Sequence, residues 1–328
     1  MSQSKRYNVG IYIIIFVVTE RTQHNKCDSG SVGRAPPCQG GSRWFESRLS
    51  LSYIAEILFS KVSVFFLTTK EKTSMNKQNA VTNKKFDLSV ATLHILAMTL
   101  MLMDHLWATL LPAQEWLTCA GRVAFPIFAF MTVEGYFHTH SFKKYMLRLL
   151  AFALISEIPF DLMYGGTWFY PFHQNVIWTF LLALLGIHLM ETVHKKQNVF
   201  LYVITVVLVV VVGALLGTLS MVDYYGAGIL TVFVFYLFRG RKWWCLLGQI
   251  TALYWINVEI LGGLMYPVQL GGIQFEICQQ GLALFALLPI WLYRGRQGHH
   301  SKPFQYLCYT FYPVHMIILV LILNYVNR

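Results

Sequence analysis

The chain has 328 residues, of which 56% are hydrophobic and only 12% are charged, and its formal net charge is +11. A soluble globular domain has about 25% charged residues, so this composition excludes an ordinary soluble domain and indicates a membrane protein. The basic net charge fits either a nucleic-acid partner or the loops of a membrane protein, and the two differ in where the charge lies.

Residues 1–74 differ from the rest of the chain. Ser29–Arg48 has no apolar period and many Gly and Pro breakers, and it resembles the conceptual translation of a transfer-RNA gene. Ile11–Val18 is too short to cross a bilayer, and Ser50–Leu67 is interrupted by charges. We therefore expect translation to start at Met75 and 1–74 to be a mis-assigned, disordered upstream extension. The alternative is a basic tail with a signal anchor.

Long apolar runs follow one another from Met75 onward. About 20 helical residues, at about 1.5 Å rise each, cross the roughly 30 Å apolar layer of a bilayer. The sequence thus predicts an all-α, polytopic helical bundle over 75–328. Its nine transmembrane helices are expected near 88–111, 122–138, 144–163, 175–194, 198–217, 224–238, 243–261, 277–293 and 304–326.

The segments between these helices differ sharply in basic charge. One alternating set contains fourteen Lys or Arg residues, whereas the other set contains only Arg122 and Arg328. The fourteen are Lys77, Lys84, Lys85, Lys143, Lys144, Arg148, Lys195, Lys196, Arg239, Arg241, Lys242, Arg294, Arg296 and Lys302. Because basic residues stay on the cytoplasmic side, the asymmetry predicts a cytoplasmic amino end and a multi-pass protein of the plasma (inner) membrane. The expected partner is the lipid bilayer, and nucleic acid is excluded.

Motifs of soluble catalysis are missing from the sequence. It contains no Walker loop, no GxGxxG opening a helix and no Cys/His spacing typical of a metal site. Any chemistry must therefore use polar side chains within the bundle. An ionisable residue at a helix centre costs about 2.5–3.5 kcal/mol, so such residues usually face the bundle interior and mark function.

Asp104, His105 and Arg122 form the first group of such residues. Neighbours on a helix point about 100° apart, so Asp104 needs a partner on another helix, and Arg122 is the candidate. This pair is either a structural contact or a support for catalysis. His105 is either a hydrogen-bonded packing residue or, because imidazole titrates near neutral pH, a proton acceptor in catalysis.

Two carboxylates lie near the outer end of the third predicted helix. Glu157 and Asp161 are four residues apart and share a helix face, with Pro159 between them. Like charges at this spacing repel, so either a cation lies between the two carboxylates or one of them is protonated. Pro159 opens the helix locally because it removes a backbone hydrogen bond.

Further polar residues flank the later helices. His173, Gln174 and Asn175 either cap the fourth helix or point into the same outer vestibule as the carboxylates. His315 is near mid-membrane on the last helix, and we expect it to line this cavity. Asp223 is expected to cap the sixth helix.

Six stretches of the sequence together resemble the TraX family. They are MDH at 103–105, GRVAFPIFAFMTVEGYFHT at 121–139, KKYMLRLLAFALISEIPFD at 143–161, HQNV at 173–176, DYYGAGIL at 223–230 and FYPVH at 311–315. The resemblance covers about 88–326 in the expected order, and the long stretches make it specific. Residues 1–74 have no counterpart in it.

The resemblance implies a membrane-embedded acyltransferase. The family's best-known member is implicated in acetylating the amino terminus of conjugative pilin, and the family is similar in layout to transmembrane acyltransferases that use a membrane histidine. It implies that His105 is the catalytic base or acyl carrier, with Asp104 and Arg122 supporting it. The implied donor is acetyl-CoA. The implied acceptor is an extracytoplasmic protein, such as a pilin amino terminus, or a cell-surface glycan.

Two other functions stay open at this point. A transporter or proton relay would use the same intramembrane acids and histidines, although no internal repeat typical of transporters is present. A non-catalytic assembly factor for pili or conjugation is the other. The candidate substrate-binding residues are Glu157, Asp161, His173, Gln174, Asn175 and His315.

Overall fold

The computed structural model describes residues 88–270, 273–298 and 301–327. All of them belong to one compact unit, Asn76–Arg328. The expected translation start at Met75 and the expected extension over 1–74 lie outside the described residues.

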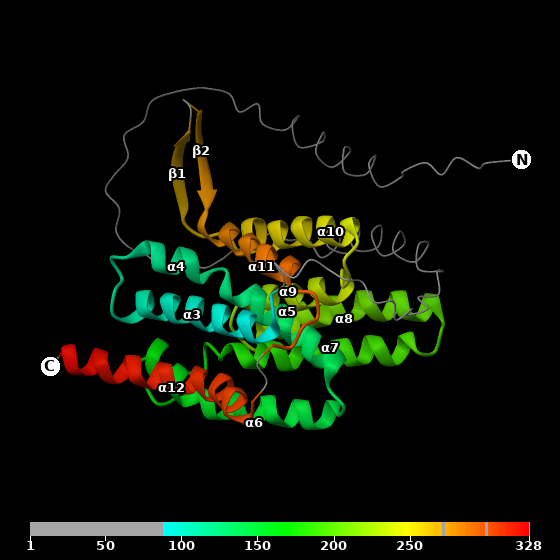
Figure 1. Ribbon diagram of the computed structural model, residues 1–328, viewed down its shortest axis with the longest axis horizontal. Helices are drawn as coiled ribbons and strands as arrows, with labels where there is room; N and C mark the ends of the chain where they lie inside the picture. Colours follow the sequence, from blue (N-terminus) through cyan, green and yellow to red (C-terminus); the bar gives the residue numbers. More distant parts are fainter. Residues whose placement is uncertain (1–87, 271–272, 299–300, 328) are drawn as a thin grey trace, which may run out of the picture. The chain divides into compact units, whose positions relative to one another are not determined.

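The described part of the chain is a helical bundle with one β-hairpin (Figure 1). Its first five helices are α3 (Val90–Thr109), α4 (Glu115–Gly121), α5 (Ala124–His138), α6 (Phe142–Tyr164) and α7 (Val176–His194). Next come α8 (Val199–Leu219), α9 (Tyr225–Leu237), α10 (Trp243–Tyr254) and the π-helix η2 (Trp255–Leu261). The strands β1 (Met265–Leu270) and β2 (Ile273–Cys278) precede the 3₁₀ helix η3 (Gln279–Ala286), α11 (Leu287–Leu292) and α12 (Lys302–Val326).

Polar side chains set where several helices begin. At the start of α3, Ser89 Oγ accepts a hydrogen bond from Thr92 N at 3.2 Å. At the start of α8, Asn198 Oδ1 accepts one from Leu201 N at 3.0 Å. Such caps satisfy amide groups that have no partner within the helix, so each apolar run starts at a defined residue.

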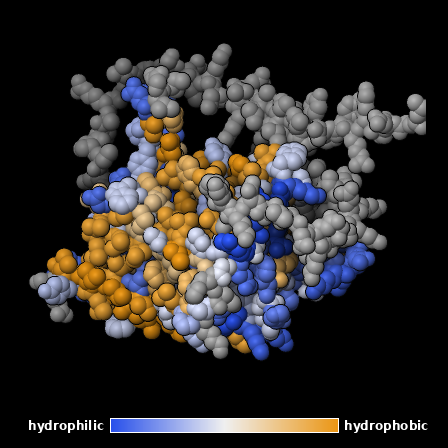
Figure 2. Space-filling model, viewed as in Figure 1, coloured by the Kyte–Doolittle hydropathy of each residue, from blue (hydrophilic) through white to orange (hydrophobic). Residues whose placement is uncertain are grey.

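Six helical segments in the described residues are long and apolar enough to cross a membrane. They are Val90–Thr109, Glu115–His138, Val176–His194, Val199–Leu219, Trp243–Leu261 and Pro303–Val326. The chain is therefore a helical membrane protein. Its surface supports this, because apolar residues cover the side of the bundle around α3, α4 and α12 on the left of Figure 2.

Each of the nine predicted segments is occupied by helix in the described residues, but three of them fall short of a full span by length or composition. α6 has 23 residues but includes five charged ones. α9 has 13 residues, and Gln279–Leu292 is also short. A 13-residue α-helix is only about 20 Å long.

The structure corrects two of the predicted boundaries and adds a change of helix type within a third segment. The segment predicted over 122–138 begins earlier, with α4, and is interrupted between Gly121 and Ala124. The segment predicted over 243–261 changes from α-helix to π-helix at Trp255. The segment predicted over 277–293 begins at Gln279, and its first part is a 3₁₀ helix. Each irregularity lies beside the cavity described in the next subsection.

The β-hairpin is absent from the sequence-based prediction. β1 and β2 pair antiparallel, with Met265 opposite Cys278 and Val268 opposite Phe275. Its sequence, MYPVQL-GG-IQFEIC, is rich in β-branched and aromatic residues around a Gly-Gly pair, which is the usual signal of a hairpin. The prediction omitted these strands because two runs of six residues do not register in a hydropathy pattern of about 20 residues.

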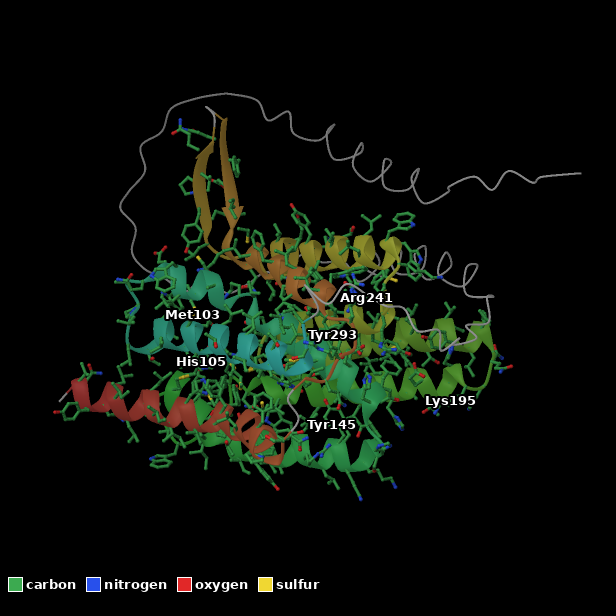
Figure 3. All side chains as sticks on the ribbon, in the orientation of Figure 1. Met103, His105, Tyr145, Lys195, Arg241 and Tyr293 are labelled. Atoms are coloured by element: carbon green, nitrogen blue, oxygen red, sulfur yellow. The ribbon has the colours of Figure 1, made fainter. Side chains whose placement is uncertain are left out.

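The two ends of the bundle differ in character. α3, α6, α8 and α10 begin at one end, to the right in Figure 1, which we call the basic end; Lys195 and Arg241 lie there in Figure 3. These four segments finish at the opposite end, where α7 and α9 begin, and we call this the cavity end. His105, near the last turn of α3, lies toward the cavity end in Figure 3.

The core of the bundle is built around α9. Every residue from Gly226 to Tyr236 except Leu230 is buried, and α9 packs against α5, α7, α8 and α10. Since α9 is enclosed by other helices, it does not have to match the thickness of the apolar layer by itself. The core fixes Tyr224 and Tyr225, at the start of α9, on the wall of the cavity.

Candidate functional site

A cavity of about 310 Å³ lies at the cavity end of the bundle. Seven separate parts of the chain contribute polar or aromatic groups to its wall. These groups are Asp104 and His105 of α3, Arg122, Tyr164, His173, the Asp223–Tyr225 turn, Gln280 and Tyr312. A cavity that brings ionisable groups together from distant parts of a chain is the usual setting of a binding or catalytic site.

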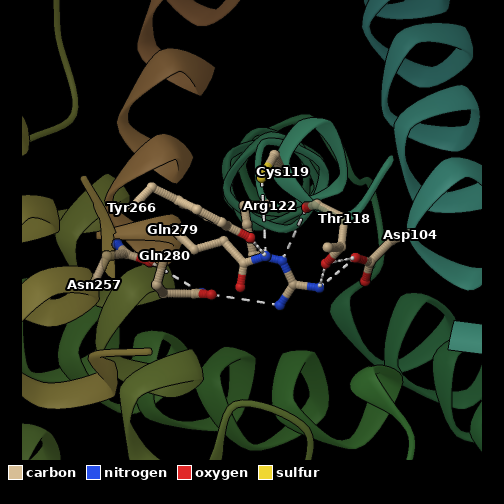
Figure 4. Close-up of polar contacts among 8 residues, drawn as sticks. All are labelled: Asp104, Thr118, Cys119, Arg122, Asn257, Tyr266, Gln279 and Gln280. Atoms are coloured by element: carbon tan, nitrogen blue, oxygen red, sulfur yellow. Dashed lines mark hydrogen bonds and ion pairs between the residues drawn. The ribbon is translucent and has the colours of Figure 1, made fainter. Parts of the chain in front are cut away.

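The predicted ion pair between Asp104 and Arg122 is present. Arg122 Nη2 donates to Asp104 Oδ1, and Thr118 Oγ1 donates to the same oxygen at 2.7 Å (Figure 4). The two ionic side chains are only 15% and 18% exposed. Gly121 permits this approach, because a Cβ on it would lie 2.4 Å from Asp104 Cβ.

Two amide side chains extend this network on the other side of Arg122. Gln280 Oε1 accepts from Arg122 Nη1 at 3.4 Å, and Gln280 Nε2 donates to Asn257 Oδ1 at 3.4 Å. Figure 4 shows the guanidinium between Asp104 and Gln280. The cation is thus fixed at the cavity wall by side chains from α3, α4, η2 and η3. The sequence predicted only one of these partners, Asp104.

His105 is hydrogen-bonded to His315 of α12. His105 Nδ1 and His315 Nε2 are 2.7 Å apart, and the two rings stack with centroids 4.9 Å apart. Both residues are buried, at 7% and 6% exposure. His315 was expected to line the cavity, but it is not among the residues of its wall and lies behind His105 instead.

The hydrogen bonds of His315 determine which nitrogen of His105 is free. His315 Nδ1 lies 2.6 Å from Phe311 O, and a carbonyl oxygen only accepts, so Nδ1 bears the proton. In neutral His315, Nε2 is then the acceptor, and His105 Nδ1 donates to it. His105 Nε2 is left with a lone pair, which is the form that a base or a nucleophile requires.

His173 and Asp223 form a second polar pair in the cavity wall. His173 Nε2 lies 3.4 Å from Asp223 Oδ1. Asp223 was predicted to cap α9, but its side chain does not cap this helix, and the cap position is occupied by Tyr224. The Asp223 carboxylate instead accepts from Tyr224 N at 3.1 Å and faces His173.

Besides His315, four of the predicted substrate-binding residues do not line the cavity: Glu157, Asp161, Gln174 and Asn175. Asn175 Oδ1 caps α7 by accepting from Ile177 N at 3.1 Å, as the capping interpretation expected. Asn175 Nδ2 also donates to Glu157 Oε2. These contacts hold the side chains in the packing between α6 and α7.

Asp161 and Gln174 have local partners as well. Asp161 Oδ2 accepts from Tyr170 N at 3.0 Å, and Gln174 Nε2 donates to Pro171 O at 3.1 Å. The second oxygens of Glu157 and Asp161 are buried and have no hydrogen-bond partner among the described residues. No arrangement of at least three His, Cys, Asp or Glu side chains suited to a metal ion occurs in that part of the chain.

The aromatic wall of the cavity was not predicted from the sequence. Tyr164, Tyr224 and Tyr312 line it, and the rings of Phe125 and Tyr224 stack with centroids 4.2 Å apart. In the sequence these residues are ordinary members of aromatic-rich helix ends. Only the YPVH and DYY patterns next to His315 and Asp223 gave a signal that could have drawn attention to them.

Comparison with known proteins matches these residues to a family. The family model described as TraX protein matches residues 89–323. The probable fimbrial assembly protein FimC, serogroup H1, of Dichelobacter nodosus is 31% identical over 122 residues, which are 32% of this chain and 48% of the relative. The chain thus spans about half the length of this curated relative. No solved structure matches. Because the family match covers more than half of the chain, including the whole cavity wall, this protein belongs to the TraX family.

Proposed function

We propose that this protein is a membrane-embedded acyltransferase that moves an acetyl group from acetyl-CoA to an extracytoplasmic acceptor. The observation that carries the proposal is His105, which lines a cavity beside the Arg122 cation while its Nδ1 is engaged by His315. A nucleophile or base beside a positive charge suits acyl transfer, since the oxygen of a reacting carbonyl becomes negative. The Arg122 guanidinium is the group that would stabilise that oxygen, and Gln280 orients it by accepting from Nη1.

The proposed topology has nine spans, with the basic end in the cytoplasm and the cavity end outside. α6 and α9 each run from one end of the bundle to the other. α9 is enclosed by α5, α7, α8 and α10, so these helices rather than α9 would contact the lipid. Lys143, Lys195 and Lys242 are exposed at the basic end, as the positive-inside rule requires. The protein is accordingly assigned to the plasma (inner) membrane.

Reporter fusions test this topology. Fusions after Lys196 and Arg241 are expected to report a cytoplasmic location, and fusions after Gly166 and Ser220 an external one, because these sites lie at opposite ends of the bundle. A pair that reports the reverse would contradict both the orientation and the number of spans. The matched control is the same set of fusions in a variant with Lys195 and Lys196 replaced by Gln. In this variant the loop after α7 is expected to stay on the cytoplasmic side less completely.

Acetyl-CoA fits this arrangement in two respects. Its phosphates suit the exposed Lys and Arg side chains at the basic end, and its thioester suits the His105 and Arg122 groups. His105 is 15 residues from Val90, so the thioester has to reach about 22 Å along α3. The acceptor would reach the cavity from the other side.

A direct assay tests the proposed activity. Purified protein in lipid nanodiscs is incubated with acetyl-CoA labelled in the acetyl group, and release of free CoA is measured with and without glucosamine as an acceptor that offers both an amine and hydroxyls. CoA release above that of protein-free nanodiscs is the expected result. No release by the wild-type protein, with either glucosamine or water as acceptor, would remove the proposal.

His315 provides a second test, because it determines the tautomer of His105. His315→Met removes the acceptor of the His105 Nδ1 proton and is expected to lower kcat by about 10⁴-fold, the effect of a wrong histidine tautomer in serine proteases. His315→Gln keeps an acceptor oxygen at a similar position and should retain far more activity. Equal kcat values for the two variants would show that His315 acts through packing alone.

Two other functions each have an observation in their favour. The name of the Dichelobacter relative favours a non-catalytic part in assembly of pili or in conjugation. The buried, unpartnered oxygens of Glu157 and Asp161 favour a proton relay or transporter. Proton or solute flux that changes in Glu157→Gln, in membranes that never consume acetyl-CoA, would favour the transporter.

A further inference from the structure

The pair of His173 and Asp223 is held in place by contacts from several parts of the chain. Asp223 is held by three contacts: its Oδ1 accepts from Tyr224 N at 3.1 Å, its backbone O accepts from Thr179 Oγ1 at 2.8 Å, and its N donates to Gln174 O at 2.9 Å. The last contact joins the segment of His173 directly to the turn that contains Asp223. The two side chains are therefore positioned by the same backbone pairing between the two turns.

The imidazole of His173 is held by aromatic rings. Tyr164 and Phe160 contact it edge-on, with centroids 5.1 Å and 5.2 Å away, and Tyr225 lies parallel to it at 6.2 Å. These contacts fix the ring plane while its Nε2 faces Asp223. The tautomer with the proton on Nε2 suits this carboxylate neighbour, because a carboxylate only accepts hydrogen bonds, and it leaves Nδ1 with the lone pair.

The turn that presents Asp223 adopts an unusual backbone conformation. Met221, Tyr224 and Tyr225 have φ angles of +51°, +60° and +49°, although none of them is glycine. Bulky residues avoid this region, and it persists mainly where surrounding structure imposes it, as at active sites and ligand clamps. A turn that only connected α8 to α9 would not need three such residues.

We propose that His173, oriented by Asp223, is the catalytic base that removes the proton of the acceptor, and that His105 carries the acetyl group. This inference rests on the proposed acetyl transfer. It follows from position: both residues line the cavity, and the His173 side chain is 22% exposed, whereas His105 is buried in α3 at 7% exposure. An acceptor arriving at the cavity end meets His173 first, and a donor arriving from the basic end meets His105.

The chemistry divides into two balanced steps. In the first, His105 Nε2 forms a bond to the acetyl carbon, the carbon–sulfur bond breaks and CoA leaves as a thiolate. The Nδ1 proton of His105 passes to His315 Nε2, 2.7 Å away, so that the acetyl-imidazole is neutral. The thiolate takes a proton from water on its own side.

In the second step, His173 Nδ1 takes the proton from the amine or hydroxyl of the acceptor as that atom bonds to the acetyl carbon. The bond between the acetyl carbon and His105 Nε2 breaks, and His105 Nδ1 recovers its proton from His315. The proton on His173 then passes to water at the cavity end. The sum is acetyl-CoA plus acceptor giving acetylated acceptor plus CoA.

The test separates the two steps. Wild-type protein and the variants His105→Ala, His173→Ala and Asp223→Asn, in nanodiscs, receive acetyl-labelled CoA with glucosamine present. Three quantities are measured: CoA released in the first turnover, label bound to protein, and total label released as acetate or acetylglucosamine. The matched control is His140→Ala, a histidine exposed in the loop between α5 and α6.

His173→Ala is expected to release one CoA per protein at the wild-type rate and to keep the acetyl group on His105, located there by mass spectrometry. Its release of label should fall by about 10²–10⁴-fold, the usual loss for a missing general base. Added imidazole should restore at least a tenth of the wild-type rate, because the cavity left by the side chain admits it. Asp223→Asn should slow the same step alone, and His105→Ala should bind no label.

Three results would overturn the assignment. One is release of label by His173→Ala at the wild-type rate. Another is loss of the first CoA turnover in His173→Ala, which would place His173 in the donor step. The third is label bound to protein in His105→Ala. A wild-type protein that releases no CoA would instead remove the proposed function itself, and the two failures are thereby distinguished.

Discussion

Replacing His105 with alanine is expected to lower acetyl transfer by about 10²–10⁴-fold, the usual range for losing a general base. The protein should still be present in the membrane at the normal level, because the imidazole borders a cavity that admits water. His105→Gln is the matched variant: its side chain keeps a hydrogen bond toward His315, but an amide does not take up a proton at neutral pH. It should be as inactive as His105→Ala.

The measurement is transfer from labelled acetyl-CoA in membranes, normalised to protein level by immunoblot. His140→Ala should retain full activity, because its side chain is exposed and lies outside the cavity. Full activity of His105→Ala would end the catalytic assignment. Activity in His105→Gln but not in His105→Ala would show that His105 contributes a hydrogen bond and no proton or acyl chemistry.

Breaking the ion pair of Asp104 and Arg122 is expected to cause the largest loss of stability. Removing one partner leaves the other charge buried without its counter-ion, which costs about 3–5 kcal/mol in the free energy of unfolding. The double variant Asp104→Asn with Arg122→Gln removes both charges and should recover most of this loss. Its acetyl transfer should stay low, because the cation is absent from the cavity.

Thermal unfolding of the purified single and double variants provides the measurement. Thr118→Val is the matched control, since it removes only a neutral donor to Asp104, for which a cost of about 1 kcal/mol is expected. If the losses of the two single variants simply add in the double variant, the two side chains do not stabilise one another. If Thr118→Val costs as much as either single variant, packing rather than charge dominates this site.

The helices and the ion pair could be predicted from the sequence because each depends on a local pattern. Apolar runs of about 20 residues have few possible structures in a bilayer. Asp104 needed a nearby cation, and Arg122 was the single basic residue in the outer segments before the carboxyl end. The supporting amides, Gln280 and Asn257, were beyond such an argument because they are uncharged and far along the chain.

The pairs of histidines and acids show what local patterns leave undetermined. His105 and His315 are 210 positions apart, and only the packing of α3 against α12 brings them together. The position of His315 along the last helix indicated its depth in the membrane. It did not indicate the direction of the side chain. Asp223 and His173 meet because two turns pair through their backbones, and no periodicity in the sequence reports such a contact.

For the carboxylates of α6, the local pattern was predicted correctly but its surroundings were not. Glu157 and Asp161 share a helix face as predicted, but this face turns toward α7 and the segment before it, and away from the cavity. Trp178 Nε1 donates to Glu157 Oε2 at 2.8 Å. Spacing along a helix identifies residues on one face, whereas tertiary packing decides what that face contacts.

The central claim is that an acetyl group from a cytoplasmic donor reaches His105, and sealed membrane vesicles test it most directly. Acetyl-CoA does not cross membranes, because its phosphates are charged. Inverted vesicles, which expose the basic end, are expected to release CoA from added acetyl-CoA, and right-side-out vesicles are not. Inverted vesicles that contain His105→Ala should release no more CoA than vesicles without the protein. Equal CoA release from wild-type and His105→Ala inverted vesicles, or release confined to right-side-out vesicles, would contradict the account.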